Sequence, residues 1–139
     1  MYDVFISYAH EDRRRALRLY RGLKQLGVQP WIDTEEILAG EDWRLAVSRG
    51  IRNSRFFMPL ISERSVSKYG YVQKEIREAL EVWDEKPENE IYVIPVRLDR
   101  SIPAHPRLQR PNWINLYLGH DEGLRRILRV IAPREAAQS

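Results

Sequence analysis

Among the residues able to do chemistry, Glu75 has the most suggestive setting in this sequence. It falls one residue before Ile76 and four after Tyr71, so a helix would place Tyr71 and Glu75 on one face, beside a buried apolar stripe. A carboxylate there, near a helix N-terminus, can project into a crevice and present its charge to a bound molecule. The alternative is a boundary glutamate aided by the helix dipole or paired with Lys74 or Arg77.

Other catalytic patterns are missing from the sequence. No GxGxxG follows a strand, and neither GxxxxGK[ST] nor HExxH occurs, which argues against a dehydrogenase, a P-loop enzyme and a zinc protease. His10, His105 and His120 stand apart without ligand spacing, and there is no cysteine, so we expect no metal site. A catalytic triad from Ser7 and His10 has no strained GxSxG turn to support it.

The elements that must position Glu75 alternate between strands and helices. An apolar run, Val4–Ile6, passes at Ser7 into a polar loop that ends at Asp12, a plausible helix N-cap. This run is apolar on both faces, which favours a strand inside a sheet covered by helices. Apolar patterns predict further strands at residues 28–32, 55–61, 91–98 and 113–117. Helical spacing predicts helices at residues 13–26, 43–51, 72–83 and 121–131.

Alternating strands and helices define the fold class. They require crossover connections and therefore predict an α/β fold, a parallel sheet with helices on both faces. For five such units the common flavodoxin-like strand order is 2-1-3-4-5, with the ligand crevice where the order reverses. That crevice lies between the first and third strands, with residues 7–12 on one wall and residues 62–75 on the other. Pro95 argues that the fourth strand is at or near a sheet edge.

Composition limits the class of protein. A length of 139 residues with 43% hydrophobic residues suits one domain with one ordinary core. The net charge is +3, but Arg13 to Arg15 is the only basic cluster and sits beside Glu11 and Asp12, so we interpret it as a solvated helix face and expect no nucleic-acid partner. The N-terminus lacks a leader pattern and no run approaches a membrane span, so we expect a cytoplasmic protein without a membrane partner.

Several short motifs, in their order and spacing, resemble a known family. They are Phe5-Ile6-Ser7-Tyr8 after the first strand, Trp31-Ile32-Asp33 before a loop closing in Gly40 and Trp43, Asn53-Ser54 before the third strand, and Tyr71-Val72-Gln73-Lys74-Glu75. Together they resemble a bacterial Toll/interleukin-1 receptor (TIR) domain over nearly the whole chain. The resemblance implies a TIR domain at residues 1–133, a frayed tail at 134–139, and the same five-stranded fold.

The resemblance also implies an activity. Many bacterial, plant and some animal TIR domains cleave NAD between nicotinamide and ribose, giving ADP-ribose or a cyclic isomer, and use one glutamate on the third helix. That glutamate matches Glu75. The family often carries tryptophan four residues earlier, where this sequence has Tyr71. NAD is then a substrate, and no cofactor is implied.

Two further groups of residues follow from the same matching. The resemblance assigns substrate binding to residues around the first two strands and the third helix, namely Phe5, Ser7, Tyr8, Asp33, Trp43 and Tyr71, with the loop up to Asp12. It assigns contact between TIR domains to a loop of seven residues, Thr34, Glu35, Glu36, Ile37, Leu38, Ala39 and Gly40. In catalytic members this loop completes the pocket of a neighbour in a head-to-tail array. Its alternative is a mobile surface loop.

Three functions stay open from the sequence. The first is an NAD glycohydrolase or cyclase in bacterial, anti-phage immune signalling, activated by self-assembly and triggered by a sensor outside this chain. The second is a non-catalytic module that joins other TIR domains, and the third is a mimic delivered to host immune pathways. If the pocket lies at the end of the first strand, Ser7→Trp should abolish turnover and leave the fold intact.

Overall fold

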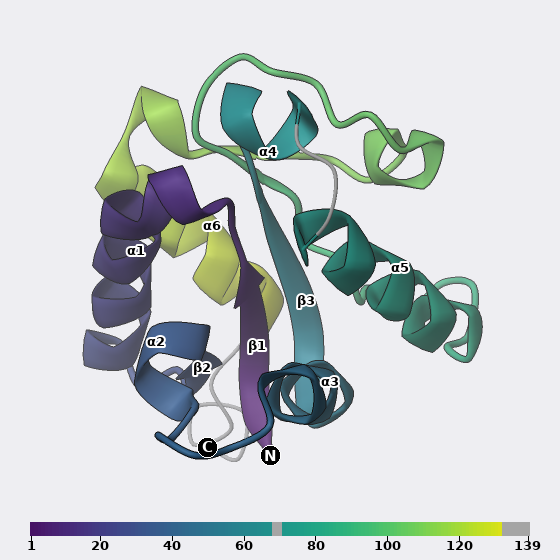
Figure 1. The fold of residues 1–139 in the computed structure, drawn as a ribbon. Coiled ribbons are helices and arrows are strands. Elements are labelled where there is room, and N and C mark those ends of the chain that lie inside the picture. Colours follow the sequence, from purple (N-terminus) through teal and green to yellow (C-terminus); the bar gives the residue numbers. More distant parts are fainter. Residues whose placement is uncertain (68–70, 132–139) are drawn as a thin grey trace, which may run out of the picture.

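A five-stranded sheet forms the centre of the structure, a computed structural model that describes residues 1–67 and 71–131 (Figure 1). All its pairings are parallel, and the strand order is β2-β1-β3-β4-β5, which confirms the predicted fold class. The strands are β1 (Tyr2–Ser7), β2 (Pro30–Trp31), β3 (Ser54–Ile61), β4 (Val96–Arg97) and β5 (Ile114–Asn115).

Helices cover both faces of this sheet. Those of the described residues are α1 (Arg13–Gln25), α2 (Asp33–Glu36), α3 (Trp43–Arg52), α4 (Glu63–Ser67), α5 (Tyr71–Asp84) and α6 (His120–Ile131), with 3₁₀ turns η1 (His10–Asp12), η2 (Pro106–Gln109) and η3 (Leu116–Leu118). Figure 1 shows α1 and α6 on one face of the sheet, and α3 and α5 on the other. No helix of residues 1–67 and 71–131 is long and apolar enough to cross a membrane.

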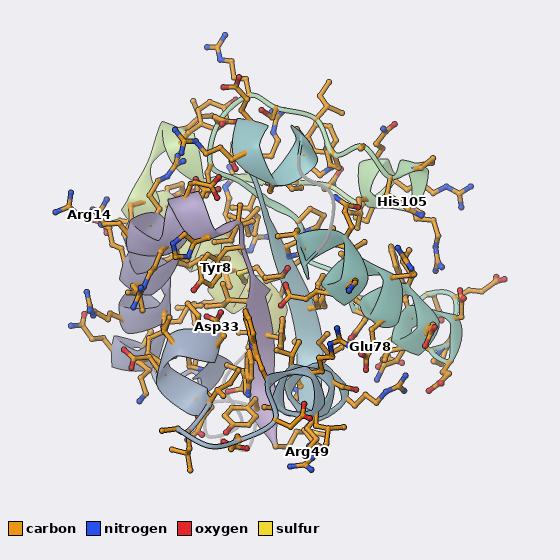
Figure 2. The ribbon with its side chains drawn as sticks, viewed as in Figure 1. Tyr8, Arg14, Asp33, Arg49, Glu78 and His105 are labelled. Carbon is orange, nitrogen blue, oxygen red and sulfur yellow. The ribbon has the colours of Figure 1, made fainter. Side chains whose placement is uncertain are left out.

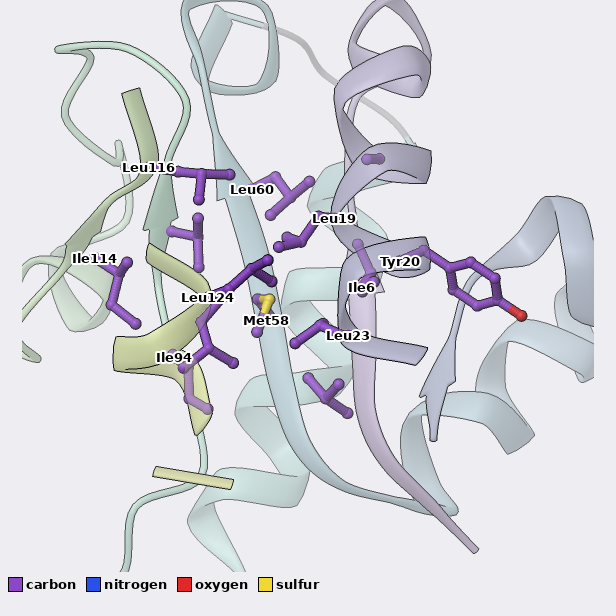
Figure 3. Packing of buried hydrophobic residues seen from close by; sticks show 14 of the residues in the cluster. Ile6, Leu19, Tyr20, Leu23, Met58, Leu60, Ile94, Ile114, Leu116 and Leu124 are labelled. Atoms are coloured by element: carbon purple, nitrogen blue, oxygen red, sulfur yellow. The ribbon is translucent and has the colours of Figure 1, made fainter. Parts of the chain in front are cut away.

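The central strand β1 supplies side chains to both layers of the core. Val4 and Ile6 join the cluster under α1 and α6, part of which Figure 3 shows, whereas Phe5 joins the cluster under α3 and α5. Successive residues of a strand point to opposite faces, so a strand buried on both sides must be apolar throughout. The strand β1 lies between β2 and β3, and Ser7, at the carboxyl end of β1, pairs with Pro59 of β3.

The outer strands are shorter than the sequence patterns predict. The pattern predicts strand over residues 91–98, but only Val96–Arg97 form a ladder, with one isolated bridge between Phe57 and Val93. Pro95 has no N–H to donate, which interrupts the ladder at that point. β4 lies next to the edge strand β5, as Pro95 predicts.

One loop and one helix start also differ from the predictions. The segment 34–40 is predicted as a loop, but its first residues belong to the short helix α2, Asp33–Glu36. Asp12 makes no side-chain cap hydrogen bond to α1, because its carboxylate instead accepts hydrogen bonds from Ser62 and Arg15. The predicted end of the domain at residue 133 and the predicted frayed tail 134–139 lie outside the described residues.

Candidate active site

The carboxylate of Glu75 lies inside the molecule, beside the carboxyl end of β1. Glu75 is 4% exposed, and the Ser7 hydroxyl donates a hydrogen bond of 2.6 Å to its Oε1. A buried carboxylate requires polar partners, since burial removes its hydration. This bond joins two segments 68 residues apart, and both belong to the walls of the predicted crevice.

The sequence of α5 explains why Glu75 faces inward. Val72, Ile76 and Ala79 recur at helical spacing and pack in the cluster beneath α3 and α5. Glu75 precedes Ile76 on the flank of this buried stripe, close enough to the sheet to reach Ser7. The sequence prediction of an inward-directed Glu75 is therefore confirmed, although its bond to Ser7 was not predicted.

A cavity of about 470 Å³ opens between α3 and α5, with Glu75 in its wall. Its lining comes from these two helices: Trp43, Arg44, Val47, Ile51, Lys74, Glu75 and Glu78. Trp43 at the start of α3 is 50% exposed, so its ring is accessible from solvent. Apolar surface with a few polar groups is typical of small-molecule sites, and the volume lies within their usual range.

The two carboxylates of this cavity have different environments. Glu78 Oε2 accepts hydrogen bonds from Ser48 Oγ at 2.6 Å and Arg52 Nε at 3.0 Å, which links α5 to α3. Figure 2 shows Glu78 on the side of α5 that faces α3. Arg52 is half exposed and neutralises Glu78 as an ordinary surface ion pair. Glu75 is instead buried against the sheet and contacts the hydroxyl of Ser7. Glu75 is therefore the better placed of the two to act on a bound molecule.

The predicted crevice between β1 and β3 is bridged by hydrogen bonds. Besides the bond from Ser7 to Glu75, the Ser62 hydroxyl donates to Oδ2 of Asp12, and both of these residues are buried. Ser7 and Asp12 of one predicted wall therefore lie against Glu75 and Ser62 of the other, but the cavity opens on the α3 side of Glu75. The expected lining by the loop up to Asp12 does not match this cavity.

Tyr8 and Asp33 form a second polar pair next to Ser7. The Tyr8 hydroxyl donates to Oδ1 of Asp33 at 2.6 Å and so connects the end of β1 to the start of α2 (Figure 2). Burial, followed by the hydrogen bond and the charge of Asp33, raises the pKa of Tyr8 well above its ordinary value. Tyr8 is therefore a neutral donor that fixes Asp33. Neither residue lines the α3–α5 cavity.

The remaining substrate-site predictions fall in three places. Phe5 is fully buried, and its ring stacks between those of Trp31 and Phe57, with centroid distances of 4.5 Å and 5.6 Å. It is therefore a core residue beneath the site. Trp43 lines the α3–α5 cavity. The side chain of Tyr71 lies outside the part of the molecule that the structure describes. Ser7 is only 1% exposed, so a tryptophan there would disrupt the fold, and the expectation of an intact Ser7→Trp fold is wrong.

Apart from Trp43, the sequence did not reveal the α3 side of the cavity. Trp43, Val47 and Ile51 recur every four residues and line it together, but the same spacing is typical of any core-facing helix. Glu78, three residues after Glu75, was likewise not singled out. Within residues 1–67 and 71–131, no group of three or more His, Asp or Glu side chains is placed to hold a metal ion.

The fold and this site define a class of protein. A parallel sheet in 2-1-3-4-5 order, with a buried glutamate on the helix after the third strand, matches what the sequence motifs imply. The TIR-domain family model matches residues 4–128, most of the chain. The chain therefore belongs to the TIR domain family.

Characterised relatives match about half of this chain. The 2′ cyclic ADP-D-ribose synthase AbTIR of Acinetobacter baumannii is 37% identical over 68 residues, 48% of this chain and 25% of that protein. The NAD(+) hydrolase TcpA of a Theionarchaea archaeon is 34% identical over 76 residues, 54% of this chain and 23% of that protein. The matched part of the chain thus spans about a quarter of the length of these relatives.

A solved structure shares the fold. The TIR domain of the Toll-related receptor TRR-2 from Hydra magnipapillata superposes with a TM-score of 0.75 at 20% identity, over 95% of this chain and 99% of that chain. The TIR domains of the activated Roq1 resistosome give a TM-score of 0.61 at 27% identity, over 70% of this chain and 57% of that chain. The fold found for this chain is thus that of solved TIR domains.

Proposed function

We propose that this chain cleaves the nicotinamide–ribose bond of NAD, with Glu75 as the catalytic residue. Membership of the TIR family supports this, as do relatives named as NAD(+) hydrolase and cyclic ADP-ribose synthase. The observation that carries the proposal is the buried Glu75 carboxylate in the wall of the α3–α5 cavity. NAD is the substrate, and the reaction requires no cofactor.

One carboxylate suffices for this reaction. Most glycosidases need a general acid to protonate a poor leaving group and a second carboxylate opposite it. Nicotinamide in NAD is already cationic and leaves as a neutral pyridine, so no proton has to be supplied. The transition state is a ribosyl oxocarbenium ion, which the negative charge of Glu75 stabilises in a site partly screened from water.

The attacking group decides the product. Water attacking the anomeric carbon gives ADP-ribose, and an atom of the substrate itself gives a cyclic isomer. In either case nicotinamide is released. The exposed ring of Trp43 offers a surface on which a planar ring of the substrate can stack, whereas Ser7, buried under Glu75, holds the carboxylate in place. Ser7 thus acts as a positioning residue in this proposal rather than as a contact to NAD.

Self-association and immune signalling complete the proposal. In this account the loop Thr34–Gly40 joins TIR domains in the cytoplasm, and a sensor outside this chain triggers assembly during bacterial defence against phage. The support is the family and the loop itself, where Leu38 is 70% exposed. An exposed leucine in a loop gains from burial against a partner.

Product analysis tests the activity. The purified chain is incubated with NAD, dilute and then concentrated with a crowding agent, and the products are separated by chromatography and weighed by mass spectrometry. We expect nicotinamide together with ADP-ribose or a species 18 Da lighter, the loss of one water that cyclisation entails. Absence of nicotinamide under both conditions would contradict the proposal.

The alternative is a non-catalytic module that binds other TIR domains. The exposed side chains of Leu38, Trp43 and Leu45 along the segment from α2 into α3 favour it, since exposed apolar side chains gain from burial against a partner. The two functions are distinguished by the product analysis. A module without activity would associate with TIR domains and leave NAD intact at every protein concentration.

A further inference from the structure

Charge in this chain is divided between two exposed segments of opposite sign. Helix α1 carries six basic residues and no acid between residues 13 and 25: Arg13, Arg14, Arg15, Arg18, Arg21 and Lys24. The ten residues 33–42, from α2 to the start of α3, carry five acids and no basic residue: Asp33, Glu35, Glu36, Glu41 and Asp42. We call these two surfaces the cationic face and the acidic segment.

The cationic face is almost unneutralised within the chain. Its six residues are exposed, because the buried side of α1 is formed by Ala16, Leu19, Tyr20 and Leu23. Arg15 pairs with Asp12 at 2.6 Å, but across residues 1–67 and 71–131 no carboxylate forms an ion pair with the other five. Figure 2 shows Arg14 extending away from α1.

The acidic segment also lacks ion pairs. Asp33 and Glu36 accept hydrogen bonds from the hydroxyls of Tyr8, Tyr2 and Tyr20. Glu41 and Asp42 accept from backbone N–H groups of the segment and of α3. In the described part of the chain, none of the five acids lies within ion-pair distance of a basic side chain. Like charges on one exposed segment repel, and a partner of opposite charge relieves that repulsion.

The two surfaces lie side by side on the molecule. Tyr20 of α1 donates to Glu36 of α2 at 3.4 Å, and Figure 1 shows α2 next to α1. A two-fold axis through this side therefore brings each cationic face against the acidic segment of the other copy, forming the same contact twice. A second copy of the chain thus supplies the matching charge for both surfaces.

We propose that the cationic face of α1 binds the acidic segment of a second copy of this chain. The inference deepens the proposed self-association by naming a receiving surface on α1, on the other face of the sheet from the α3–α5 cavity. This two-fold contact therefore differs from the head-to-tail contact that the resemblance implies, and it does not depend on NAD cleavage. The contact is electrostatic, so association weakens as salt screens the charges, over a Debye length of about 8 Å at physiological ionic strength.

Charge-reversal variants test the pairing. One variant reverses part of the cationic face (Arg14→Glu with Arg21→Glu), and the other reverses part of the acidic segment (Glu35→Arg with Glu41→Arg). These side chains are exposed, and circular dichroism verifies that each variant is folded. The control, Arg77→Glu with Arg110→Glu, changes the net charge equally at exposed arginines outside α1. Sedimentation velocity without NAD measures association at 50 and 300 mM NaCl.

The expected pattern has three parts. Wild type and control associate at 50 mM NaCl, with a dissociation constant about tenfold higher or more at 300 mM. Each reversal variant alone is monomeric, because like charges face each other. An equimolar mixture of the two variants associates again, because each surface meets an opposite charge.

Other outcomes overturn the proposal. A wild type that stays monomeric at 50 mM NaCl, or a mixture that associates no better than its components, would contradict the pairing. So would a control as deficient as the α1 variant, since net charge would then be the cause. Binding of a DNA duplex by a monomeric wild type would assign the cationic face to a polyanion instead. Nicotinamide release from NAD, measured separately, distinguishes failure of the contact from failure of the activity.

Discussion

The hydroxyl of Ser7, at the end of the central strand, donates a 2.6 Å hydrogen bond to the carboxylate of Glu75 on α5. Both residues are buried, so the bond is shielded from competition by water. It fixes the direction in which the carboxylate meets the α3–α5 cavity. A catalytic group held this way needs little reorganisation during the reaction.

The first prediction concerns this bond. Ser7→Ala removes the hydroxyl that donates to the Glu75 carboxylate, so turnover of NAD should fall about 10- to 100-fold, mainly in kcat, because small misplacements of a catalytic group are costly. Steady-state nicotinamide release measures this. Ser54→Ala is the matched control. It also removes a buried serine hydroxyl, which donates to the backbone carbonyl of Gly50 at 2.6 Å, but it lies at the amino end of β3, away from Glu75. Equal turnover of the two variants would contradict the role of Ser7.

The second prediction concerns the pair of Tyr8 and Asp33. A double-mutant cycle with Tyr8→Phe and Asp33→Ala should give a coupling energy of about 1–2 kcal/mol in the free energy of unfolding, as expected for a part-buried hydrogen bond to a charged group. Urea denaturation of the four proteins measures it. Additive effects of the two substitutions would mean that the pair contributes nothing to stability.

The third prediction compares two helical glycines. Alanine normally stabilises a helix interior relative to glycine, but a Cβ at Gly50 would lie 2.5 Å from the ring of Trp31. That ring is buried and stacked on Phe5, so it has no room to move. Gly50→Ala should therefore lower the free energy of unfolding by about 1–3 kcal/mol.

Gly123→Ala serves as the comparison for Gly50→Ala. Its Cβ would meet the end of the flexible Leu116 side chain, which can change rotamer, so we expect a smaller loss of stability. Denaturant midpoints of both variants against wild type give the result. A Gly50→Ala protein as stable as wild type would show that Trp31 is not held rigidly.

The fourth prediction concerns pH. Burial of His120, with the charge of Arg18 nearby, lowers its pKa below the ordinary value, although Asp121 opposes the shift. The unfolded chain therefore takes up a proton at a higher pH than the folded one does. The contribution of neutral His120 to the free energy of unfolding is complete above the pKa of about 6.5 in the unfolded chain. It is lost as the pH falls through the lower pKa of the folded chain.

His120→Gln is the variant that isolates this effect. It should flatten the decline in the free energy of unfolding between about pH 7.5 and 5.5, because the group that titrates there is removed. Urea denaturation at four or five pH values in that window measures the slope. A slope identical to that of wild type would show that His120 does not link stability to pH.

Sequence patterns predicted most of the fold, because the spacing of apolar residues reflects burial on both faces of the sheet. β1 is apolar throughout and Gly27, with φ of 88°, ends the first helix where predicted. The two-residue strands β2, β4 and β5 were overestimated, since their apolar residues are buried by neighbouring segments and not by ladder pairing. Burial alone does not separate these two environments.

The candidate site was only half visible in the sequence. Glu75 stood out because helical spacing places it beside a buried stripe near a helix N-terminus, and because it matches the family glutamate. Val47 and Ile51, by contrast, look like any core residues. Tyr8 and Phe5 were assigned to a pocket by resemblance, but contacts across the fold decide where their rings lie. Such contacts join residues far apart in the chain and leave no local pattern.

Nicotinamide release by Glu75→Gln tests the central claim most directly. Glutamine keeps the size of the side chain and can still accept a hydrogen bond from Ser7, but it removes the negative charge that stabilises the oxocarbenium ion. The matched control is Glu78→Gln, one turn further along α5 in the wall of the same cavity. We predict a fall of about 100-fold or more for Glu75→Gln and at most a few-fold for Glu78→Gln. Undiminished release by folded Glu75→Gln would contradict the account.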